Sequence, residues 1–229
     1  MQFAIAKHII HLSSAMKRLL ALSALLSAGL LPPAWSQQSV PPPAPGRSAL
    51  PPSALSGPQL LSELRKGGLV IYFRHTSTDF SRDDRNSKSD EDCDRQRPLT
   101  DKGRDEARQI GAAFRELKIP VARVLASPRC RTMETAMLAF GRAEKENSAR
   151  GGPAAPDAPD RYAGLRALLT TPLGTGRNVV ISSHGNPFYA VAGAPYLAEG
   201  EAAVVKPLGQ DFAIVARVRH DAWRALAGK

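Results

Sequence analysis

The sequence has little of several residue types. It contains two cysteines in 229 residues, aromatic side chains make up 6%, and only one long apolar run is present. A single apolar run excludes a multi-span membrane protein. Hydrophobic residues at 43% and charged residues at 23% exclude a collagen, a coiled coil and a wholly disordered chain. The length suits one globular domain with a hydrophobic core and is short for two.

The first 36 residues contain no aspartate or glutamate and have the pattern of a secretory signal peptide. Lys17 and Arg18 precede an apolar run of 13 residues, 19–31, which is short for a membrane span. Small residues just before position 37 predict cleavage there.

Two alternatives stay open at this end of the chain. The segment could remain as an uncleaved N-terminal anchor, and the true start is either Met1 or Met16. In both cases the rest of the chain crosses a membrane. We therefore expect a periplasmic or secreted protein with no stable membrane span after signal cleavage.

Proline is concentrated between the N-terminal segment and the remainder of the chain. Residues 32–58 hold nine of the 19 prolines. Such a stretch favours extended conformations and cannot build a core. We divide the chain into a signal peptide (1–36), a Pro-rich linker (37–58) and a globular domain (59–229).

The chain is basic, with a formal net charge of +10 that falls to +7 when the predicted signal peptide is removed. A basic protein can meet nucleic acid, an anionic envelope surface or a phosphorylated substrate. The basic residues are scattered, without a run of five or interleaved aromatics. We therefore expect mostly a solvated surface and no nucleic-acid partner, with an envelope-binding protein as a lesser alternative.

The globular part alternates predicted strands and helices. Apolar, β-rich runs predict strands over 69–73, 121–126, 178–182, 202–205 and 212–218. Helical spacing predicts helices over 59–66, 102–117, 129–140, 160–170 and 221–226, with loops over 76–97 and 142–158. This alternation predicts a three-layer α/β/α sandwich with a mostly parallel central sheet.

Basic and imidazole side chains lie in the short segments that follow the first three predicted strands: Arg74, His75, Arg131 and His184. The carboxyl ends of parallel strands lie at one edge of a sheet, where ligands bind. Outside the first 36 residues the chain has only three histidines, and two of them are in this position. We therefore expect the four side chains to surround one site.

Two histidines and two arginines suit a tetrahedral dianion. Guanidinium groups match phosphate oxygens, and a neutral imidazole can attack phosphorus to form a phosphohistidine. The charge of Arg74 beside His75 favours the neutral, nucleophilic imidazole. The same charge would repel a cation, and no HxxxH or HxH spacing is present, so we predict no metal and no cofactor.

These residues belong to ordered motifs that resemble a known family. The motifs are RH-x-x-T (Arg74, His75, Thr78), SP-x-x-R-x-x-x-TA (Ser127, Pro128, Arg131, Thr135, Ala136) and SHG (Ser183, His184, Gly185). Their order resembles the histidine phosphatase superfamily, also called the phosphoglycerate mutase-like family. The segment 97–107 is similar to that family's LT-x-x-G-x-x-QA segment, with Glu106 where glutamine is usual. The resemblance covers about residues 69–185.

The resemblance implies a phosphoglycerate mutase-like fold and a role for each motif residue. His75 would be the nucleophile that becomes phosphorylated. Arg74, Arg131 and His184 would form the phosphate pocket, with a hydroxyl contact from Thr78. Catalysis would then depend on positioning and on electrostatic stabilisation of the transferring phosphoryl group, without a metal.

The general acid is less clear. One branch of the family has an aspartate directly after the second histidine, but this chain has Gly185 there, so that assignment fails. The other branch commonly has a glutamate between the second and third motifs. Glu144 and Glu146 occupy that interval, in a segment with no supporting pattern.

Carboxylates further along the chain are the better candidates. Glu201 immediately precedes a predicted strand, so its carboxylate could face the phosphate pocket, and we predict that it is the proton donor. Glu199 is the alternative, and Asp79 and Asp101 are weaker candidates.

Cys93 and Cys130 are the only cysteines. In an exported protein such a pair predicts one disulfide, which would tie the loop 76–97 to the site; two free thiols are the alternative. We do not expect Cys130 to be a nucleophile, because the CX5R pattern needs an arginine where Ala136 stands. The loop itself holds seven acidic residues and four arginines, and we expect it to border the pocket and select the substrate.

The sequence thus predicts an exported, metal-independent phosphomonoesterase, a histidine acid phosphatase-like hydrolase, acting through a phosphohistidine at His75. The substrates to consider are a sugar phosphate, a lipopolysaccharide core phosphate and a phosphoprotein bearing phosphohistidine. A mutase is less expected, because an exported enzyme would rarely meet glycolytic intermediates. The alternative from another class is a non-catalytic phosphate- or anion-binding module of the cell envelope.

Overall fold

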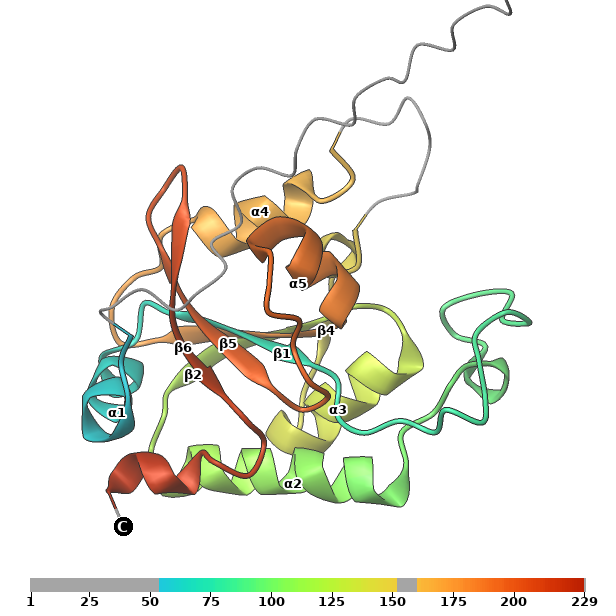
Figure 1. Cartoon of the computed structure of the whole chain (residues 1–229), viewed down its shortest axis with the longest axis horizontal. Coiled ribbons are helices and arrows are strands. Elements are labelled where there is room, and N and C mark those ends of the chain that lie inside the picture. Colours follow the sequence, from blue (N-terminus) through green and yellow to red (C-terminus); the bar gives the residue numbers. More distant parts are fainter. Residues whose placement is uncertain (1–53, 152–159, 229) are drawn as a thin grey trace, which may run out of the picture. The chain divides into compact units, whose positions relative to one another are not determined.

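A six-stranded mixed sheet forms the centre of the computed structural model (Figure 1). Its strands are β1 (Val70–Arg74), β2 (Val121–Ala126), β3 (Glu144–Lys145), β4 (Asn178–Ser183), β5 (Ala202–Pro207) and β6 (Phe212–Val218). The structure describes residues 54–151 and 160–228. The predicted signal peptide and the linker up to residue 53 lie outside the described residues.

The strand order is β3-β2-β4-β1-β5-β6. The pairs β1–β4, β2–β4 and β2–β3 are parallel, whereas β1–β5 and β5–β6 are antiparallel. The sheet is therefore mostly parallel, as predicted. Because β4 lies between β2 and β1 and is parallel to both, the carboxyl ends of these three strands lie at the same edge of the sheet.

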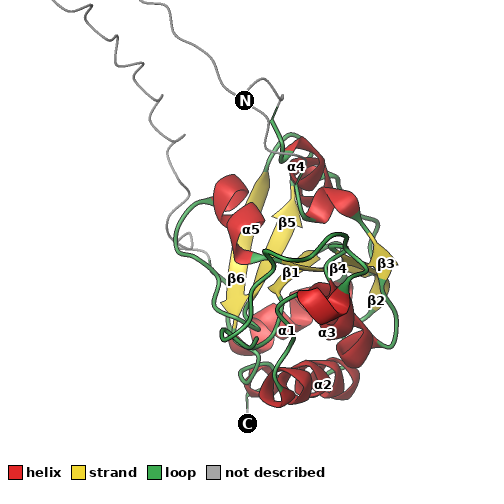
Figure 2. Ribbon diagram, turned by 90° about the vertical axis from the view of Figure 1, so that its right-hand side faces the viewer, coloured by secondary structure: helices red, strands yellow, loops and turns green. Residues whose placement is uncertain are grey.

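Helices cover both faces of the sheet (Figures 1 and 2). They are α1 (Gly57–Lys66), α2 (Asp101–Glu116), α3 (Cys130–Phe140), α4 (Ala163–Thr170) and α5 (Gly185–Ala192). Helices α1, α2 and α3 lie on one face, and α4 and α5 lie on the other. This arrangement confirms the predicted α/β/α layers. No helix in the described ranges is long and apolar enough to cross a bilayer.

Alternate residues of β1 point into two separate hydrophobic cores. Ile71 and Phe73 belong to the core under α1, α2 and α3, whereas Val70 and Tyr72 belong to the core under α4 and α5. All four residues are at most 1% exposed. A continuous apolar run therefore suits this strand because both of its faces are buried.

The amino end of α2 is packed against the segment that follows His75. Thr100 caps the helix, and its hydroxyl oxygen accepts a hydrogen bond from the Gly103 N–H at 3.0 Å. A Cβ at Gly103 would lie 2.0 Å from the Ser77 carbonyl oxygen. Only glycine permits this approach, so the packing of α2 against the segment after β1 depends on Gly103.

Most predicted elements are present, with three differences. Helix α5 was not predicted; its short sequence has a proline near the start, and Phe188 is stabilised by packing against Tyr72 at a ring-centroid distance of 4.7 Å. The predicted loop 142–158 contains the edge strand β3, which depends on pairing with β2. The final helix is a single 3-10 segment, Arg224–Ala227, rather than a helix over 221–226.

Candidate active site

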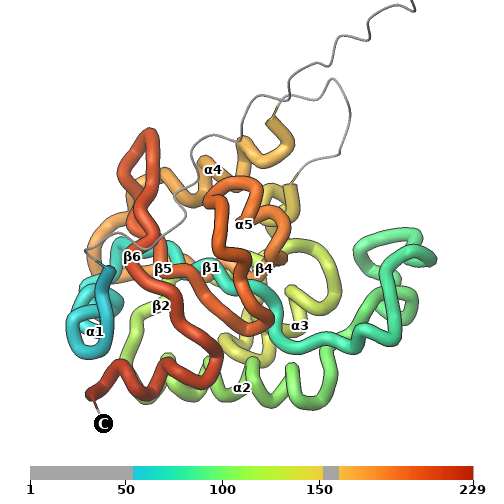
Figure 3. Tube along the Cα trace, in the orientation of Figure 1, coloured from blue at the N-terminus to red at the C-terminus, as the bar shows by residue number. Residues whose placement is uncertain are grey.

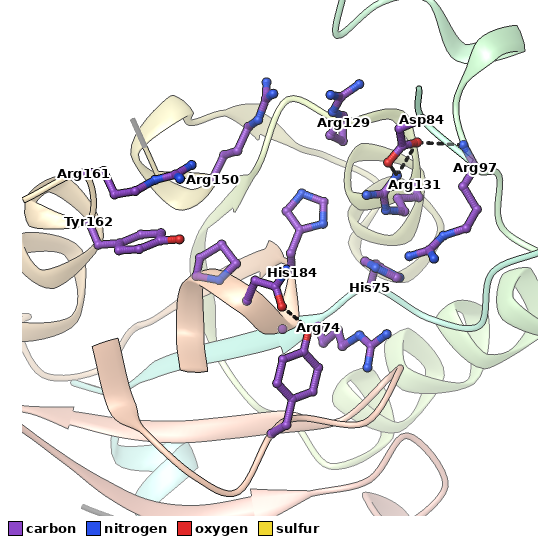
Figure 4. Close-up of a pocket in the computed structure, with 14 residues that line it drawn as sticks. Arg74, His75, Asp84, Arg97, Arg129, Arg131, Arg150, Arg161, Tyr162 and His184 are labelled. Carbon is purple, nitrogen blue, oxygen red and sulfur yellow. Dashed lines mark hydrogen bonds and ion pairs between the residues drawn. The ribbon is translucent and has the colours of Figure 1, made fainter. Parts of the chain in front are cut away.

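Four predicted site residues line one cavity of about 330 Å³ at the carboxyl edge of the sheet (Figure 4). Arg74 ends β1 and His75 follows it, Arg131 lies in the first turn of α3, and His184 follows β4. The rings of His75 and His184 meet edge to face, with centroids 5.6 Å apart. The structure therefore brings together the side chains that the sequence placed on separate strand ends.

His75 is held with one ring nitrogen bonded and the other free. Its side chain is 2% exposed, and Nδ1 lies 3.0 Å from the Thr76 carbonyl oxygen. A carbonyl oxygen only accepts hydrogen bonds, so in the neutral ring Nδ1 carries the proton and Nε2 keeps its lone pair. This is the tautomer that a nucleophile attacking through Nε2 requires.

Burial keeps the His75 ring neutral. The pKa of His75 is lowered from 6.5 to about 3, and burial is the largest cause. The positive charges of Arg131 and Arg74 act in the same direction, whereas the Thr76 hydrogen bond opposes them. The imidazole is therefore uncharged at neutral pH.

His184 is a second neutral imidazole at the site. Burial is the main cause that lowers the pKa of His184 well below 6.5, and the charge of Arg131 adds to it. Its Nε2 lies 2.9 Å from the Ser127 hydroxyl oxygen, and its carbonyl oxygen accepts a hydrogen bond from the Tyr72 hydroxyl at 2.8 Å. Contacts from β1 and from the end of β2 thus orient this residue.

Three arginines that line the cavity have spare hydrogen-bond donors. The Nε atoms of Arg74, Arg97 and Arg131 are buried and have no hydrogen-bond partner. A buried, unpartnered donor is costly, whereas charge-assisted hydrogen bonds to an anion are strong. The cavity is thus suited to bind an oxyanion beside His75.

Arg131 is paired with a carboxylate from the loop 76–97. Its Nη1 donates a hydrogen bond to Asp84 Oδ1 at 3.0 Å. Asp84 also accepts a hydrogen bond from the Arg97 backbone N–H at 2.8 Å. Burial would raise the pKa of Asp84, but the Arg97 N–H and the charge of Arg131 outweigh it, so this pKa is lowered.

Arg74 is positioned by the segment before β5. Its guanidinium donates to the Leu197 carbonyl oxygen at 2.9 Å and to Glu199 Oε1 at 3.3 Å. It also lies over the Tyr196 ring, 5.3 Å from the centroid. These contacts hold Arg74 beside His75.

Thr78 and Glu199 lie together behind His75 rather than among the residues lining the cavity. The Thr78 hydroxyl donates to Glu199 Oε1 at 2.6 Å, so it is already engaged and does not supply the predicted phosphate contact. Glu199 Oε1 also lies 3.8 Å from His75 Nδ1. Glu199 thus faces the bonded side of the imidazole.

The predicted proton donor, Glu201, does not line the cavity. Its Oε2 accepts a hydrogen bond from the Ala198 N–H at 2.8 Å, and its Oε1 lies 3.9 Å from Arg217. Glu201 directly precedes β5, as predicted, but its carboxylate is hydrogen-bonded to the backbone of the segment that leads into β5. This position does not support the predicted role.

The other carboxylates considered from the sequence are also engaged elsewhere. Glu144 pairs with Arg123, the Glu146 carboxylate accepts from the Ser148 N–H, Asp79 accepts from Ser81, and Asp101 pairs with Arg104. Among the described residues that line the cavity, Asp84 is the one carboxylate. Nothing in the sequence distinguishes Asp84 from the six other acidic residues of its loop.

The cavity also gathers arginines that sequence reasoning did not assign to the site. Beside Arg74 and Arg131, its lining includes Arg97, Arg129, Arg150 and Arg161. Tyr162, Asn186 and Tyr196 line it as well. These residues come from loops and element ends, where hydrophobic periodicity carries no information about position.

Cys93 and Cys130 form a disulfide in the structure, with Cα atoms 5.6 Å apart. The bond joins the loop 76–97 to the first residue of α3, next to Arg131. In Figure 3 this loop leaves β1, extends away from the sheet and returns to α2. The disulfide therefore restrains the loop that carries Asp84.

Within the ranges that the structure describes, no three His, Cys, Asp or Glu side chains cluster as a potential metal site. Metal independence of the reaction stays a prediction.

Comparisons with known proteins give one family-model match. Residues 70–150 match the model described as "Histidine phosphatase superfamily (branch 1)". The matched region contains the motifs of His75 and Arg131 and ends before His184. It confirms the resemblance that the motifs indicated. No curated protein matches the chain.

Several solved structures are similar at low sequence identity. The "protein histidine phosphatase SixA complexed with tungstate" is 22% identical, with 66% of this chain and 97% of that chain covered and a TM-score of 0.45. Bacillus stearothermophilus YhfR is 15% identical, with 64% and 94% covered and a TM-score of 0.46. The "putative phosphohistidine phosphatase SixA from Agrobacterium tumefaciens" is 15% identical, with 66% and 97% covered and a TM-score of 0.45.

Proposed function

We propose, on the match of residues 70–150 to the model described as "Histidine phosphatase superfamily (branch 1)", that the protein is a metal-independent phosphomonoesterase acting through a phosphohistidine at His75. One observation carries the proposal: a buried neutral imidazole with a free Nε2 shares a cavity with arginines whose Nε donors have no partner. The nucleophile and the anion site are therefore adjacent before substrate binds.

In the first step the Nε2 lone pair attacks phosphorus, and the bond from phosphorus to the ester oxygen breaks. The guanidinium groups of Arg74 and Arg131 bind the phosphoryl oxygens as their charge redistributes. Phosphorylation at Nε2 makes the ring cationic while Nδ1 keeps its proton. The Thr76 carbonyl oxygen at 3.0 Å and Glu199 at 3.8 Å stabilise that charge.

The departing oxygen requires a proton, and we assign this role to Asp84 in place of Glu201. Asp84 is ionised in the free enzyme, where it pairs with Arg131. Substrate phosphate competes with Asp84 for Arg131, and a dianion beside the released carboxylate raises its affinity for a proton, so Asp84 takes up a proton from solvent as substrate binds and donates it to the departing oxygen. In the second step water attacks the phosphohistidine, orthophosphate leaves and Nε2 recovers its lone pair. Asp84 accepts the proton from that water, which restores the acid for the next cycle.

The test is turnover of p-nitrophenyl phosphate by the wild type and by His75→Ala, each with and without a chelator. We expect wild-type activity that chelator does not change, and a loss of at least about a thousandfold in kcat in the variant, because the covalent route is removed. His220→Gln is the control, because this third histidine does not line the cavity.

Trapping the intermediate makes the test specific. The wild type is mixed with p-nitrophenyl phosphate and quenched rapidly without acid. The peptide that contains His75 should then carry a phosphoryl group that acid removes and alkali does not. An inactive wild type would favour the alternative function, a non-catalytic anion-binding module. In such a module, a bound anion would displace Asp84 from its ion pair with Arg131, which is 3.0 Å long without a ligand. Activity lost with chelator would contradict metal independence.

We further propose that the protein is exported, on the pattern of residues 1–36. A disulfide between Cys93 and Cys130 agrees with an oxidising compartment such as the periplasm. The substrate is then a phosphate ester present outside the cytoplasm.

A further inference from the structure

The six arginines of the cavity fall into two groups. Arg74, Arg97 and Arg131 carry the unpartnered Nε atoms described above. We call Arg129, Arg150 and Arg161 the outer arginines. In Figure 4, Arg150 and Arg161 lie on the side of the cavity opposite Arg97, with His184 between them.

The outer arginines carry more positive charge than their surroundings neutralise. Arg129 and Arg150 share one carboxylate, Asp90, at 3.5 Å and 2.7 Å. In the described part of the chain no carboxylate pairs with Arg161, whose guanidinium lies over the Tyr162 ring, 5.1 Å from the centroid. Three guanidinium groups therefore face one carboxylate.

The phosphoryl group that His75 accepts does not account for this charge. That group is bound near His75, where Arg74, Arg97 and Arg131 have free donors. Both histidines are neutral and Asp84 is the one described carboxylate in the cavity lining, so the far side remains cationic. A concave, cationic wall beyond the reacting group is suited to an anionic group on the leaving alcohol.

We propose that the outer arginines, together with Tyr162, form a second anion subsite, and that the substrate is a small phosphomonoester whose leaving group carries a second phosphate. The inference rests on the proposed function and names its substrate class. Guanidinium groups bind phosphate oxygens in pairs, and the Tyr162 hydroxyl, which Figure 4 shows directed toward the cavity, adds a neutral donor. Of the substrates considered above, a sugar phosphate fits this site better than a single phosphohistidine when the sugar carries a second phosphate.

The first experiment compares glucose 1,6-bisphosphate with glucose 1-phosphate and glucose 6-phosphate as substrates of the wild type. We expect kcat/KM for the bisphosphate to exceed that of either monophosphate by about tenfold or more, mainly through a lower KM, because additional charge-assisted hydrogen bonds form. Equal kcat/KM values for the three sugars would overturn the inference.

The second experiment removes single charges from the subsite. In Arg161→Gln and Arg150→Gln, kcat/KM for the bisphosphate should fall at least fivefold more than kcat/KM for p-nitrophenyl phosphate. The matched control is Arg166→Gln, which removes an arginine nearby in the chain that pairs with Asp160 and does not line the cavity. A loss in the control as large as that in Arg161→Gln would indicate a general charge effect and contradict the subsite.

Binding separates this inference from the proposed function. Calorimetry on His75→Ala measures the affinities for glucose 1,6-bisphosphate and glucose 6-phosphate without turnover. We expect tighter binding of the bisphosphate, reduced by a second substitution at Arg161. Tighter binding of the bisphosphate together with an inactive wild type would contradict the proposed phosphatase activity and support the subsite. An active wild type that binds both sugars equally would contradict only the subsite.

Discussion

At the scale of single residues, the site depends on how His75 is bonded on one side and left free on the other. The Thr76 carbonyl oxygen lies 3.0 Å from Nδ1, so the unprotonated nitrogen is the one available to the substrate. Burial and neighbouring arginines keep the ring neutral. Tautomer and charge state are thus both set before substrate arrives.

The depressed pKa values of His75 and His184 predict a dependence of stability on pH. An unfolded histidine binds a proton below about pH 6.5, whereas folded His75 does so only near pH 3. The unfolded state binds more protons between these values, so the free energy of unfolding decreases as the pH falls through this window. Each histidine contributes a slope of up to about 1.4 kcal/mol per pH unit.

Thermal unfolding at pH 7 and pH 5 checks this prediction. We expect the wild-type Tm to fall over this interval, and His184→Gln to show a smaller fall because one of the two groups is removed. An equal fall in both proteins would show that His184 titrates normally in the folded state.

Leaving-group dependence tests the proton donor. Asp84→Asn is expected to slow an alkyl phosphate by about 10²–10⁴-fold and an aryl phosphate much less, because the aryl oxygen departs without a proton. Glu201→Gln should affect both substrates equally, since its carboxylate is bonded to the Ala198 N–H away from the cavity. Selective loss with alkyl phosphates in Glu201→Gln would restore the prediction made from the sequence.

At the scale of elements, three strand ends set the reactive residues and one long loop completes the cavity. The loop 76–97 supplies Asp84 to Arg131, and Asp90 to Arg129 and Arg150. Its attachment to α3 is the Cys93–Cys130 disulfide. The regular elements therefore position His75, whereas the loop supplies carboxylates that pair with the arginines.

Loss of the disulfide is expected to affect both stability and substrate affinity. The bond closes a loop across 37 positions, for which the chain-entropy model gives about 3–4 kcal/mol of stabilisation. The double variant Cys93→Ser, Cys130→Ser should unfold at lower urea concentration and show an altered KM, because Asp84 and Asp90 are held less firmly. Reductant should change the wild type in the same way and leave the double variant unchanged; an effect of reductant on both would point to another cause.

At the scale of the whole molecule, the proposed export depends on residues 1–36, which lie outside the described residues. We expect the protein purified from the bacterial periplasm to begin at about residue 37, with the disulfide formed. Mass spectrometry of the intact protein from cell fractions measures both features. Recovery of the full chain with its N-terminal segment in the membrane fraction would favour the uncleaved anchor.

The local pattern of the sequence was enough to predict the layered fold and the four residues that share the cavity. Buried parallel strands are continuous apolar runs in the sequence, and the residues after them must meet at one sheet edge. Arg74, His75, Arg131 and His184 could therefore be predicted to share one site.

Only the tertiary structure decided which carboxylates and further arginines reach the cavity. Glu201 is adjacent to β5 yet turns away, whereas Asp84 arrives from an irregular loop. Irregular backbone has no period from which the direction of a side chain follows, and its path here depends on the disulfide and on ion pairs between residues far apart in the chain. The position of His75 could therefore be predicted from the sequence, whereas the places of Asp84 and of the outer arginines became known only from the folded structure.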